Sequence, residues 1–359
     1  MVCRAWRNVI RATPQMWTSI AVNMERSDTG YPEFINSQFL RSGGLPLLVE
    51  VFSYPPPYRS LENPPVMRLF KIVNAHSNRW NCLETCLHPG ILQYLHGNPE
   101  THTSLLEHIL VKRYGSSSAY HVQDEFGMLN SNPSPTTVHL GDLSFGSIRI
   151  SWHRVTHVEI SSLSFDLDSY LALFASAQVM THLTVQKLWF PHDALTSTPV
   201  VPIEHTTLRA LKIYECGLAL NPLLRALKLP CLEEIFIDYD YFAPLTDLIT
   251  RSNCHLKRLT LAMSRNSNMP EDTKIDLLRL LEHTPSLVAL MIQDFRHTNL
   301  LVDCLEPHSQ GGSPTFPDAF THEPELLPLL HTLVIRMSHG LEWHSTCIPN
   351  WVPAPVVEL

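Results

Sequence analysis

Residues 208–261 read LRALKIYECGLALNPLLRALKLPCLEEIFIDYDYFAPLTDLITRSNCHLKRLTL and contain one pattern three times. An apolar residue is followed, after two variable positions, by a second apolar residue and, after one more variable position, by a third. The copies are Leu208-Leu211-Ile213, Leu232-Ile235-Ile237 and Leu256-Leu259-Leu261. The last step has a period of two, so these side chains are predicted to lie on one face of a short strand.

The same pattern recurs on both sides of this stretch. Full copies are Val155-Val158-Ile160, Met180-Leu183-Val185, Leu287-Leu290-Ile292 and Leu330-Leu333-Ile335, and weaker ones are Leu106-Ile109-Val111 and Val138-Leu140. The central residues of the seven full copies are 25, 28, 24, 24, 31 and 43 positions apart. Leucine-rich repeats, each a strand followed by a helix, have units of roughly 20 to 29 residues, so the last two intervals imply insertions.

The stretches between these strands carry signals for helices. Asn221 and Pro222 suit the cap and first turn of a helix that would bury Leu223, Leu224 and Leu227. In two further connections the expected helix starts are Pro270-Glu271-Asp272 and a cap at Asp166 or Asp168. Their predicted buried residues are Ile275, Leu278 and Leu281 in the first and Tyr170, Leu171 and Phe174 in the second.

The predicted fold class is therefore α/β: a leucine-rich-repeat solenoid with a curved parallel sheet, helices on its convex side, and short helices before it. One strand of this kind cannot bury its apolar face alone, but stacked copies share a continuous core. An ordinary α/β domain with apolar strands is the alternative. We expect the solenoid over residues 80–345 and a Pro-containing tail over 346–359.

Two short stretches near the N-terminus carry a resemblance to a known family. Residues 2–7 read VCRAWR and residues 13–20 read TPQMWTSI. They resemble the second half of the F-box in fungal F-box/leucine-rich-repeat proteins, as do the later segments FLRSG (39–43), LPL (45–47) and HSNRW (76–80). The residues that carry the F-box remnant are Val2, Cys3, Trp6, Pro14 and Trp17. We accordingly expect a partial F-box over 1–22 and a helical connector over 23–79.

The resemblance implies substrate recognition for an SCF-type cullin ubiquitin ligase, with the repeats holding a protein target and the F-box binding a Skp-type adaptor. The family's F-box begins with a Leu-Pro-x-Glu-Ile/Leu helix, which would lie upstream of Met1. Either the sequence is a fragment or a mis-started gene, or adaptor binding has been lost. A repeat scaffold unconnected to ubiquitin transfer is the alternative.

The N-terminal residues also have an interpretation independent of the family. Val2, Trp6, Val9 and Ile10 fall on one face of a helix that Pro14 ends. We expect Met16, Trp17 and Ile20 to fold back onto this stripe, leaving Arg4, Arg7 and Arg11 in solvent. A mitochondrial transit peptide is a second interpretation of these three arginines.

The composition excludes several other classes of protein. Charged residues make up 17% of the chain and the formal net charge is −8, which disfavours nucleic-acid and membrane partners. The eight cysteines are scattered and no Asn-x-Ser/Thr sequon occurs, so we expect a cytoplasmic or nuclear protein. No catalytic motif is present, and we expect neither an enzyme nor a cofactor. Cys82 and Cys86 with His88 form the nearest approach to a metal site, against the simpler interpretation of small core residues.

The outward positions of the predicted strands form the candidate binding surface on the concave face. In the middle of the sheet they place two aromatic residues among charged ones. The predicted partner-binding residues are Lys212, Tyr214, Glu234, Phe236, Asp238 and Arg258. Aromatic residues beside arginine are typical of interface hot spots. A cross-strand ladder of opposite charges, without binding, is the alternative and is compatible with it.

Overall fold

The computed structural model describes residues 3–26, 28, 30–53, 64–87, 91–113, 126–128, 131–143, 145–161, 166–186, 201–215, 220–238, 242–262, 271–293, 327–336 and 342–346. The chain divides into two compact units, Met1–Leu183 and Thr184–Leu359. No helix of the described part is both long and apolar enough to span a membrane.

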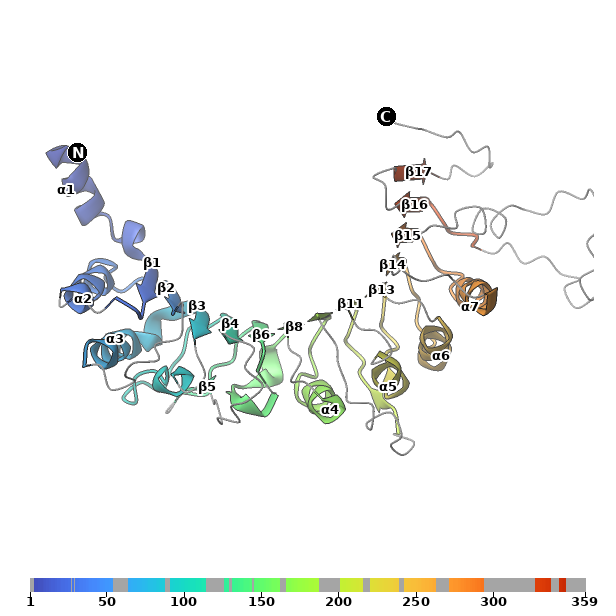
Figure 1. The fold of residues 1–359 in the computed structure, drawn as a ribbon, viewed down its shortest axis with the longest axis horizontal. Coiled ribbons are helices and arrows are strands. Elements are labelled where there is room, and N and C mark those ends of the chain that lie inside the picture. Colours follow the sequence, from blue (N-terminus) through green and yellow to red (C-terminus); the bar gives the residue numbers. More distant parts are fainter. Residues whose placement is uncertain are drawn as a thin grey trace, which may run out of the picture. The chain divides into compact units, whose positions relative to one another are not determined.

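The protein is an α/β protein in which sequential parallel strands alternate with helices, an arrangement consistent with a leucine-rich-repeat-type solenoid (Figure 1). The strand order is β1-β2-β3-β4-β6-β8-β9 in the first unit and β9-β11-β13-β14-β15-β16-β17 in the second. Strand β9 (His182–Gln186) lies at the division between the units. Twelve strands of this order run parallel, and only β17 pairs antiparallel, with β16.

The described residues of the first unit include four α-helices and five short 3-10 turns besides its strands. The strands of the main sheet are β1 (Ser19–Asn23), β2 (Leu47–Phe52), β3 (Trp80–Leu87), β4 (His108–Arg113), β6 (Thr137–Gly141) and β8 (His157–Ser161). The helices are α1 (Arg4–Ala12), α2 (Tyr31–Arg41), α3 (Pro64–Ala75) and α4 (Leu167–Ser176). The turns are η1 (Pro14–Trp17), η2 (Ser77–Arg79), η3 (Leu92–Tyr94), η4 (Phe145–Ser147) and η5 (Trp152–Arg154), and β5 (Phe126–Gly127) pairs with β7 (Ile148–Arg149).

The second unit repeats the same alternation. Its strands are β11 (Ala210–Tyr214), β13 (Glu234–Asp238), β14 (Arg258–Ala262), β15 (Ala289–Gln293), β16 (Thr332–Arg336) and β17 (Glu342–Thr346). Its helices are α5 (Leu220–Arg225), α6 (Ala243–Ser252) and α7 (Glu271–Glu282), which lie on one side of the sheet (Figure 1). On the same side, β10 (Ile203–Glu204) pairs with β12 (Leu227–Lys228).

The repeat pattern predicted strands β11, β13, β14, β15 and β16 of this unit and their register. Ile235 and Ile237 of β13 are fully buried, and Ile235 pairs with Leu211 on one side and Leu259 on the other. The parallel alignment continues into β15 and β16, where Leu259 pairs with Leu290 and Leu290 with Leu333. The repeated apolar positions therefore form continuous buried rows, as the sharing of one core requires.

The sheet begins earlier in the chain than we expected. Residues 23–79 contain helices α2 and α3, but they also contain β2, which pairs in parallel with β1 and β3. Val49 and Val51 of β2 are completely buried. Short helices do precede the sheet, as α1 and η1, but residues 23–79 are not a purely helical connector. Two of the strands, β1 and β2, are already part of the sheet before residue 80.

Two helices bury faces that differ slightly from the predicted ones. In α4, Asp166 is the N-cap, its carboxylate accepting a hydrogen bond from the Ser169 N–H, but the helix buries Leu173 rather than Leu171. In α7 the buried residues are Leu277, Leu280 and Leu281, while Ile275 is 49% exposed. Ile275 precedes Leu277 by two positions, which turns it about 200° around the helix from the buried stripe. In the connection after β11, Leu227 is buried as predicted but belongs to β12.

Arg79 joins the two segments FLRSG and HSNRW that resemble the F-box family. Its guanidinium donates to the carbonyl oxygens of Leu45 and Phe39 and to the Ser42 hydroxyl, at 2.6–3.3 Å. Because carbonyl groups at a helix end lack partners within the helix, these bonds stabilise the end of α2. Arg251 in α6 has the same role in the second unit, donating to the Leu224 and Leu227 carbonyls.

Thr85 occupies a core position of β3, between Val51 and Val111 in register. It is 1% exposed, and among the described residues its hydroxyl has no hydrogen-bond partner. Replacing a buried, unpaired hydroxyl by an apolar group of the same shape removes a desolvation cost. We expect Thr85→Val to raise the free energy of unfolding by about 1 kcal/mol in urea denaturation. The half-exposed Thr260→Val is the control, and a loss of stability in Thr85→Val would show that the hydroxyl is bonded.

His76 gives the first unit a predicted pH dependence. Its ring stacks on Phe39 at 4.6 Å between centroids, and burial, followed by the charge of Arg79, lowers the His76 pKa below 6.5. As the pH falls, the unfolded chain binds the proton first, so this contribution to stability is present above about pH 6.5 and is lost as the pH falls through the folded-state pKa. We expect His76→Phe, which keeps a ring on Phe39, to lose less free energy of unfolding between about pH 7.5 and about pH 5.5. An identical pH dependence in the two proteins would contradict this.

Candidate protein-binding surface

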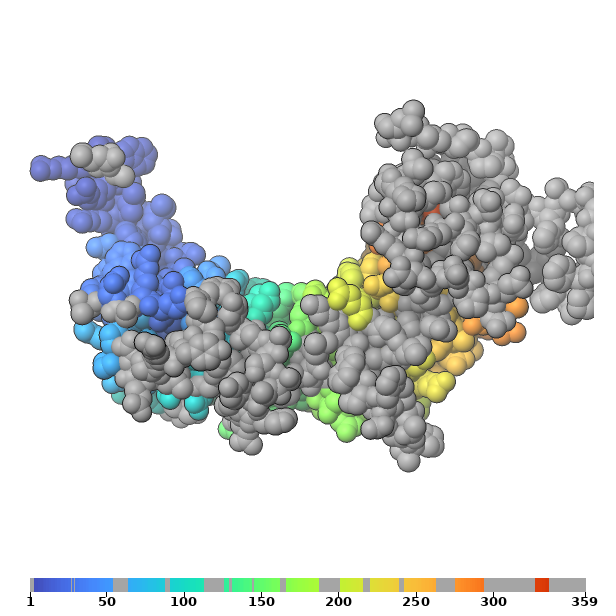
Figure 2. Space-filling view, in the orientation of Figure 1, coloured from blue at the N-terminus to red at the C-terminus, as the bar shows by residue number. Residues whose placement is uncertain are grey.

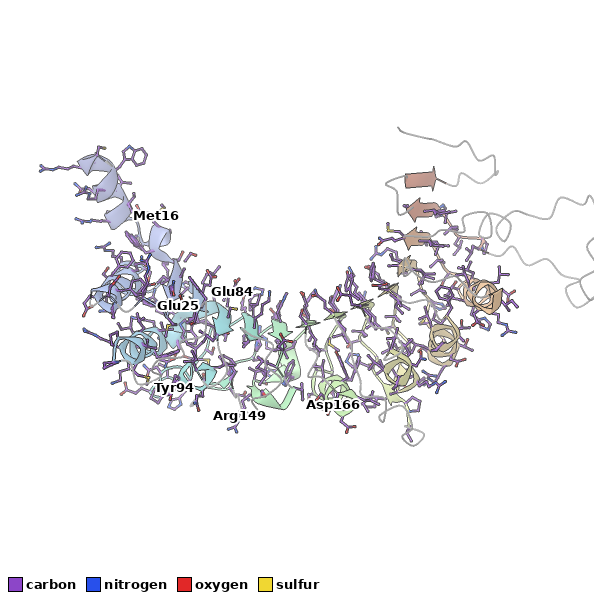
Figure 3. The ribbon with its side chains drawn as sticks, viewed as in Figure 1. Met16, Glu25, Glu84, Tyr94, Arg149 and Asp166 are labelled. Carbon is purple, nitrogen blue, oxygen red and sulfur yellow. The ribbon has the colours of Figure 1, made fainter. Side chains whose placement is uncertain are left out.

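In each unit, one face of the sheet points away from the helices, and we call it the open face. Its residues alternate along each strand with the buried ones. Figure 3 shows Glu84 of β3 on this side, and Tyr94 and Arg149 on the helical side. In the second unit the open face carries all six predicted partner-binding residues: Lys212 and Tyr214 from β11, Glu234, Phe236 and Asp238 from β13, and Arg258 from β14.

Tyr214 and Phe236 form an aromatic pair in the middle of this surface. Their ring centroids are 4.3 Å apart and the planes are inclined by 31°. Lys212, not Tyr214, pairs directly with Phe236 across the strands, so Tyr214 reaches Phe236 diagonally. Both aromatic side chains are half-buried. Such a pair contributes about 1 kcal/mol beyond its area burial and offers a preformed apolar contact to a partner.

Glu234 sits between two cations on the neighbouring strands. One carboxylate oxygen accepts from Lys212 Nζ at 3.0 Å, and the other accepts from Arg258 Nη2 at 2.7 Å and Nε at 3.0 Å. Partial burial acts to raise the Glu234 pKa, but the bonds and charges of Lys212 and Arg258 outweigh it and hold this pKa below its usual value. The cross-strand charge ladder that we considered is therefore present, beside the aromatic pair.

A second charged triad, which the sequence analysis missed, lies at the edge where these strands begin. Glu233 is 3.9 Å from Arg209 Nη1 and 3.3 Å from Lys257 Nζ. The three residues occupy equivalent positions, one residue before β11, β13 and β14, at intervals of 24 residues. That interval was the available signal, because residues one repeat apart become neighbours when parallel strands stack.

Asp238 lies at the opposite end of β13. Its Oδ2 accepts a hydrogen bond from the backbone N–H of Glu215, at 3.4 Å. Glu215 has a positive φ of 50° as the chain leaves β11. The open face of the second unit therefore changes character along the strands, from two cation-rich triads, through an aromatic pair, to two acidic residues.

The open face of the first unit carries a different set of side chains. His157 and His182 stack with centroids 4.3 Å apart, and each ring Nδ1 lies within 2.9 Å of the hydroxyl of the preceding threonine. His139 Nδ1 lies 3.0 Å from a Glu159 carboxylate oxygen. His157 and His182 stand at equivalent positions, the first residues of β8 and β9, but the sequence did not predict that the rings stack.

Cys82 and Cys86 also lie on this open face, and they are half-buried there rather than in the core. Four residues apart on one strand, their Cα atoms are about 13 Å apart, too far for both thiolates to bind one tetrahedral ion. Burial, then the charge of Glu84, raises the Cys82 pKa, which keeps the thiol protonated. In the part of the chain that the structure describes, no group of three or more His, Cys, Asp or Glu is placed to hold a metal; His88 lies outside it.

The N-terminal residues that resemble part of an F-box form helix α1 and turn η1, with Cys3 as N-cap and Pro14 just after the helix. Trp17 fixes their junction: its indole N–H donates to the Ile10 carbonyl at 2.8 Å, and the Arg41 guanidinium lies 4.7 Å from its ring. Of the expected stripe, Ile10 is half-buried and bonded to Trp17, whereas Trp6 and Val9 are exposed. Val2 lies outside the described residues.

Helix α1 fully buries none of its residues, and Trp6 is 65% exposed. Val9 and Met16 are more than half exposed, whereas Ile20 is buried as part of β1. The expected fold-back of Met16 and Ile20 is therefore wrong, because β1 carries Ile20 into the sheet. Figure 2 shows α1, in dark blue, extending away from the rest of the first unit.

The comparisons with known proteins add no family to this description. No family model matches the chain, and no curated protein matches it. The parallel α/β fold rests on the structure alone, and the F-box resemblance stays a prediction from the sequence.

Proposed function

We propose that the chain is a protein-binding leucine-rich-repeat module and that the open face of its second unit holds a protein target. The observation that carries this proposal is the Tyr214–Phe236 pair, a half-buried apolar contact flanked by ordered charges. Interface hot spots combine aromatic and arginine side chains in this way, surrounded by polar residues. The chain performs no chemistry of its own in this role, and the proposed compartment is the cytoplasm or nucleus.

We further propose that the target is presented to an SCF-type cullin ubiquitin ligase through a Skp-type adaptor. The support is the F-box-like sequence together with the exposed apolar side chains of Trp6, Val9 and Met16. An exposed apolar helical face is a common feature of protein interaction sites. A repeat scaffold unconnected to ubiquitin transfer remains the second candidate, and adaptor binding separates the two.

One test of the proposed binding surface concerns the aromatic pair. We expect Phe236→Ala to weaken target capture at least about tenfold, because truncating a hot-spot aromatic side chain costs about 2 kcal/mol or more. Capture is measured by quantitative co-precipitation of bound proteins, followed by titration of the most enriched one. Thermal unfolding should change little, since the ring lies on the open face.

The control for this experiment is Ile275→Ala, which removes an exposed apolar side chain from helix α7 on the other side of the sheet. Equal capture by Phe236→Ala and the unaltered chain would remove the aromatic pair from the binding site. A loss in Ile275→Ala as well would indicate a general effect on the fold.

A separate test of the proposed ligase role concerns the adaptor. We expect a Skp-type adaptor to co-purify with the chain, or with a form extended by the coding sequence upstream of Met1, and Trp6→Ala to reduce its yield. The reason is that Trp6 would lose a large apolar contact area on binding. Leu40→Ala in α2 is a matched control, since Leu40 is 66% exposed and Trp6 65%. If neither form retains the adaptor, the ligase role is refuted and the scaffold role remains.

A further inference from the structure

The charged side chains of the second unit are distributed unevenly along its strands. At the edge where β11, β13 and β14 begin lie Arg209, Lys257 and Arg258, and Lys212 lies two residues into β11; these four cations share two carboxylates, Glu233 and Glu234. Each triad thus has one positive charge in excess. Glu215 and Asp238 lie at the opposite end of the strands.

The carboxylates in these triads are also the less exposed members. In the first, Glu234 is 24% exposed, against 39% for Lys212 and 66% for Arg258. In the second, Glu233 is less exposed than either Arg209 or Lys257. A partner that approaches these triads therefore meets more of the guanidinium and ammonium groups than of the carboxylates that neutralise them.

Resting on the proposed function of this surface, we propose that its target is an acidic peptide segment of a protein, which places Asp or Glu side chains on this cationic edge and an apolar side chain on the Tyr214–Phe236 pair. Because Arg258 already binds Glu234 through two of its nitrogens, the guanidinium is held in place before the partner arrives, and little side-chain entropy is lost on binding.

The geometry also sets the spacing within the peptide. Phe236 lies two positions beyond Glu234, and Tyr214 four beyond Ala210, distances of about 7 and about 13 Å along the strands. An extended peptide spans these distances in about two to four residues. The carboxylates of Glu215 and Asp238 repel an acidic residue placed at the other end, so the orientation of the peptide is also determined.

The experiment selects random displayed peptides of about twelve residues, long enough to cover the strands, on the full chain. Selected peptides are then synthesised and titrated against the chain and its variants by fluorescence anisotropy. We expect Phe236-dependent peptides enriched in Asp or Glu about two to four residues from an apolar residue. We expect Arg258→Glu to weaken their binding about tenfold at low salt, and less at high salt, because exposed charges are screened.

The matched control is Lys228→Glu. Lys228 is 40% exposed and pairs with Glu204, so its charge environment resembles that of Lys212, but it belongs to β12 on the helical side of the sheet. Lys228→Glu changes the net charge of the chain by the same amount as Arg258→Glu. Peptide binding should nevertheless be retained in Lys228→Glu, because the changed residue lies outside the binding surface. Lys257→Glu is the second test variant, and a reselection on it should yield fewer acidic peptides.

The outcomes separate this inference from the proposed function. Peptides that require Phe236 but lack acidic residues, or that lose as much affinity in Lys228→Glu as in Arg258→Glu, would overturn the acidic-target inference and leave the binding surface standing. Peptides whose binding is indifferent to Phe236→Ala, or a selection that yields no binder, would count against the binding surface itself and therefore against both.

Discussion

The structure depends on one constraint: a five-residue strand with apolar residues on one face cannot bury that face by itself. Ile235 and Ile237 of β13 become fully buried only because Leu211 and Ile213 on one side and Leu259 and Leu261 on the other align with them. This sharing of the core fixes the parallel register, since a shift of one residue would expose every apolar side chain. The same alignment also fixes which side chains are neighbours on the open face, although burial does not determine which residue types occur there.

The register therefore decides which charged side chains meet. Glu234 pairs with Ala210 and Arg258, and Lys212 comes from one further pleat along β11. The contacts of the candidate surface therefore join side chains of neighbouring strands. The pairing of the buried apolar residues determines which of these side chains meet. The aromatic pair follows the same logic, since its two rings project from the same face of adjacent strands and meet diagonally.

Much of this could be predicted from the sequence, because the repeat interval carries both the fold and the neighbours on the open face. The pattern identified β11, β13, β14, β15 and β16 and all six residues of the surface. It missed β1, which carries the same spacing as Trp17-Ile20-Val22, and β2, in which Pro46 stands where the preceding apolar residue of the full repeat would be. It also did not predict the contacts of Arg79 or the buried face of α7, because these depend on how helices pack in three dimensions. The exposure of Trp6 has the same origin, since β1 takes Ile20 into the sheet and leaves α1 without a surface to cover.

The excess of positive charge at one edge arises because three adjacent strands, an odd number, each contribute one charged residue to each triad. Across β11, β13 and β14 the two triads alternate as cation, carboxylate, cation. A fourth charged strand with a carboxylate would have balanced them, but the next repeat has Val288 and Ala289 at the two equivalent positions. The ladder therefore ends on a cation rather than closing with a carboxylate. Because the neutralising carboxylates are less exposed than the cations, a stabilising ladder is also a cationic surface, so that the charge-ladder and binding interpretations describe the same residues.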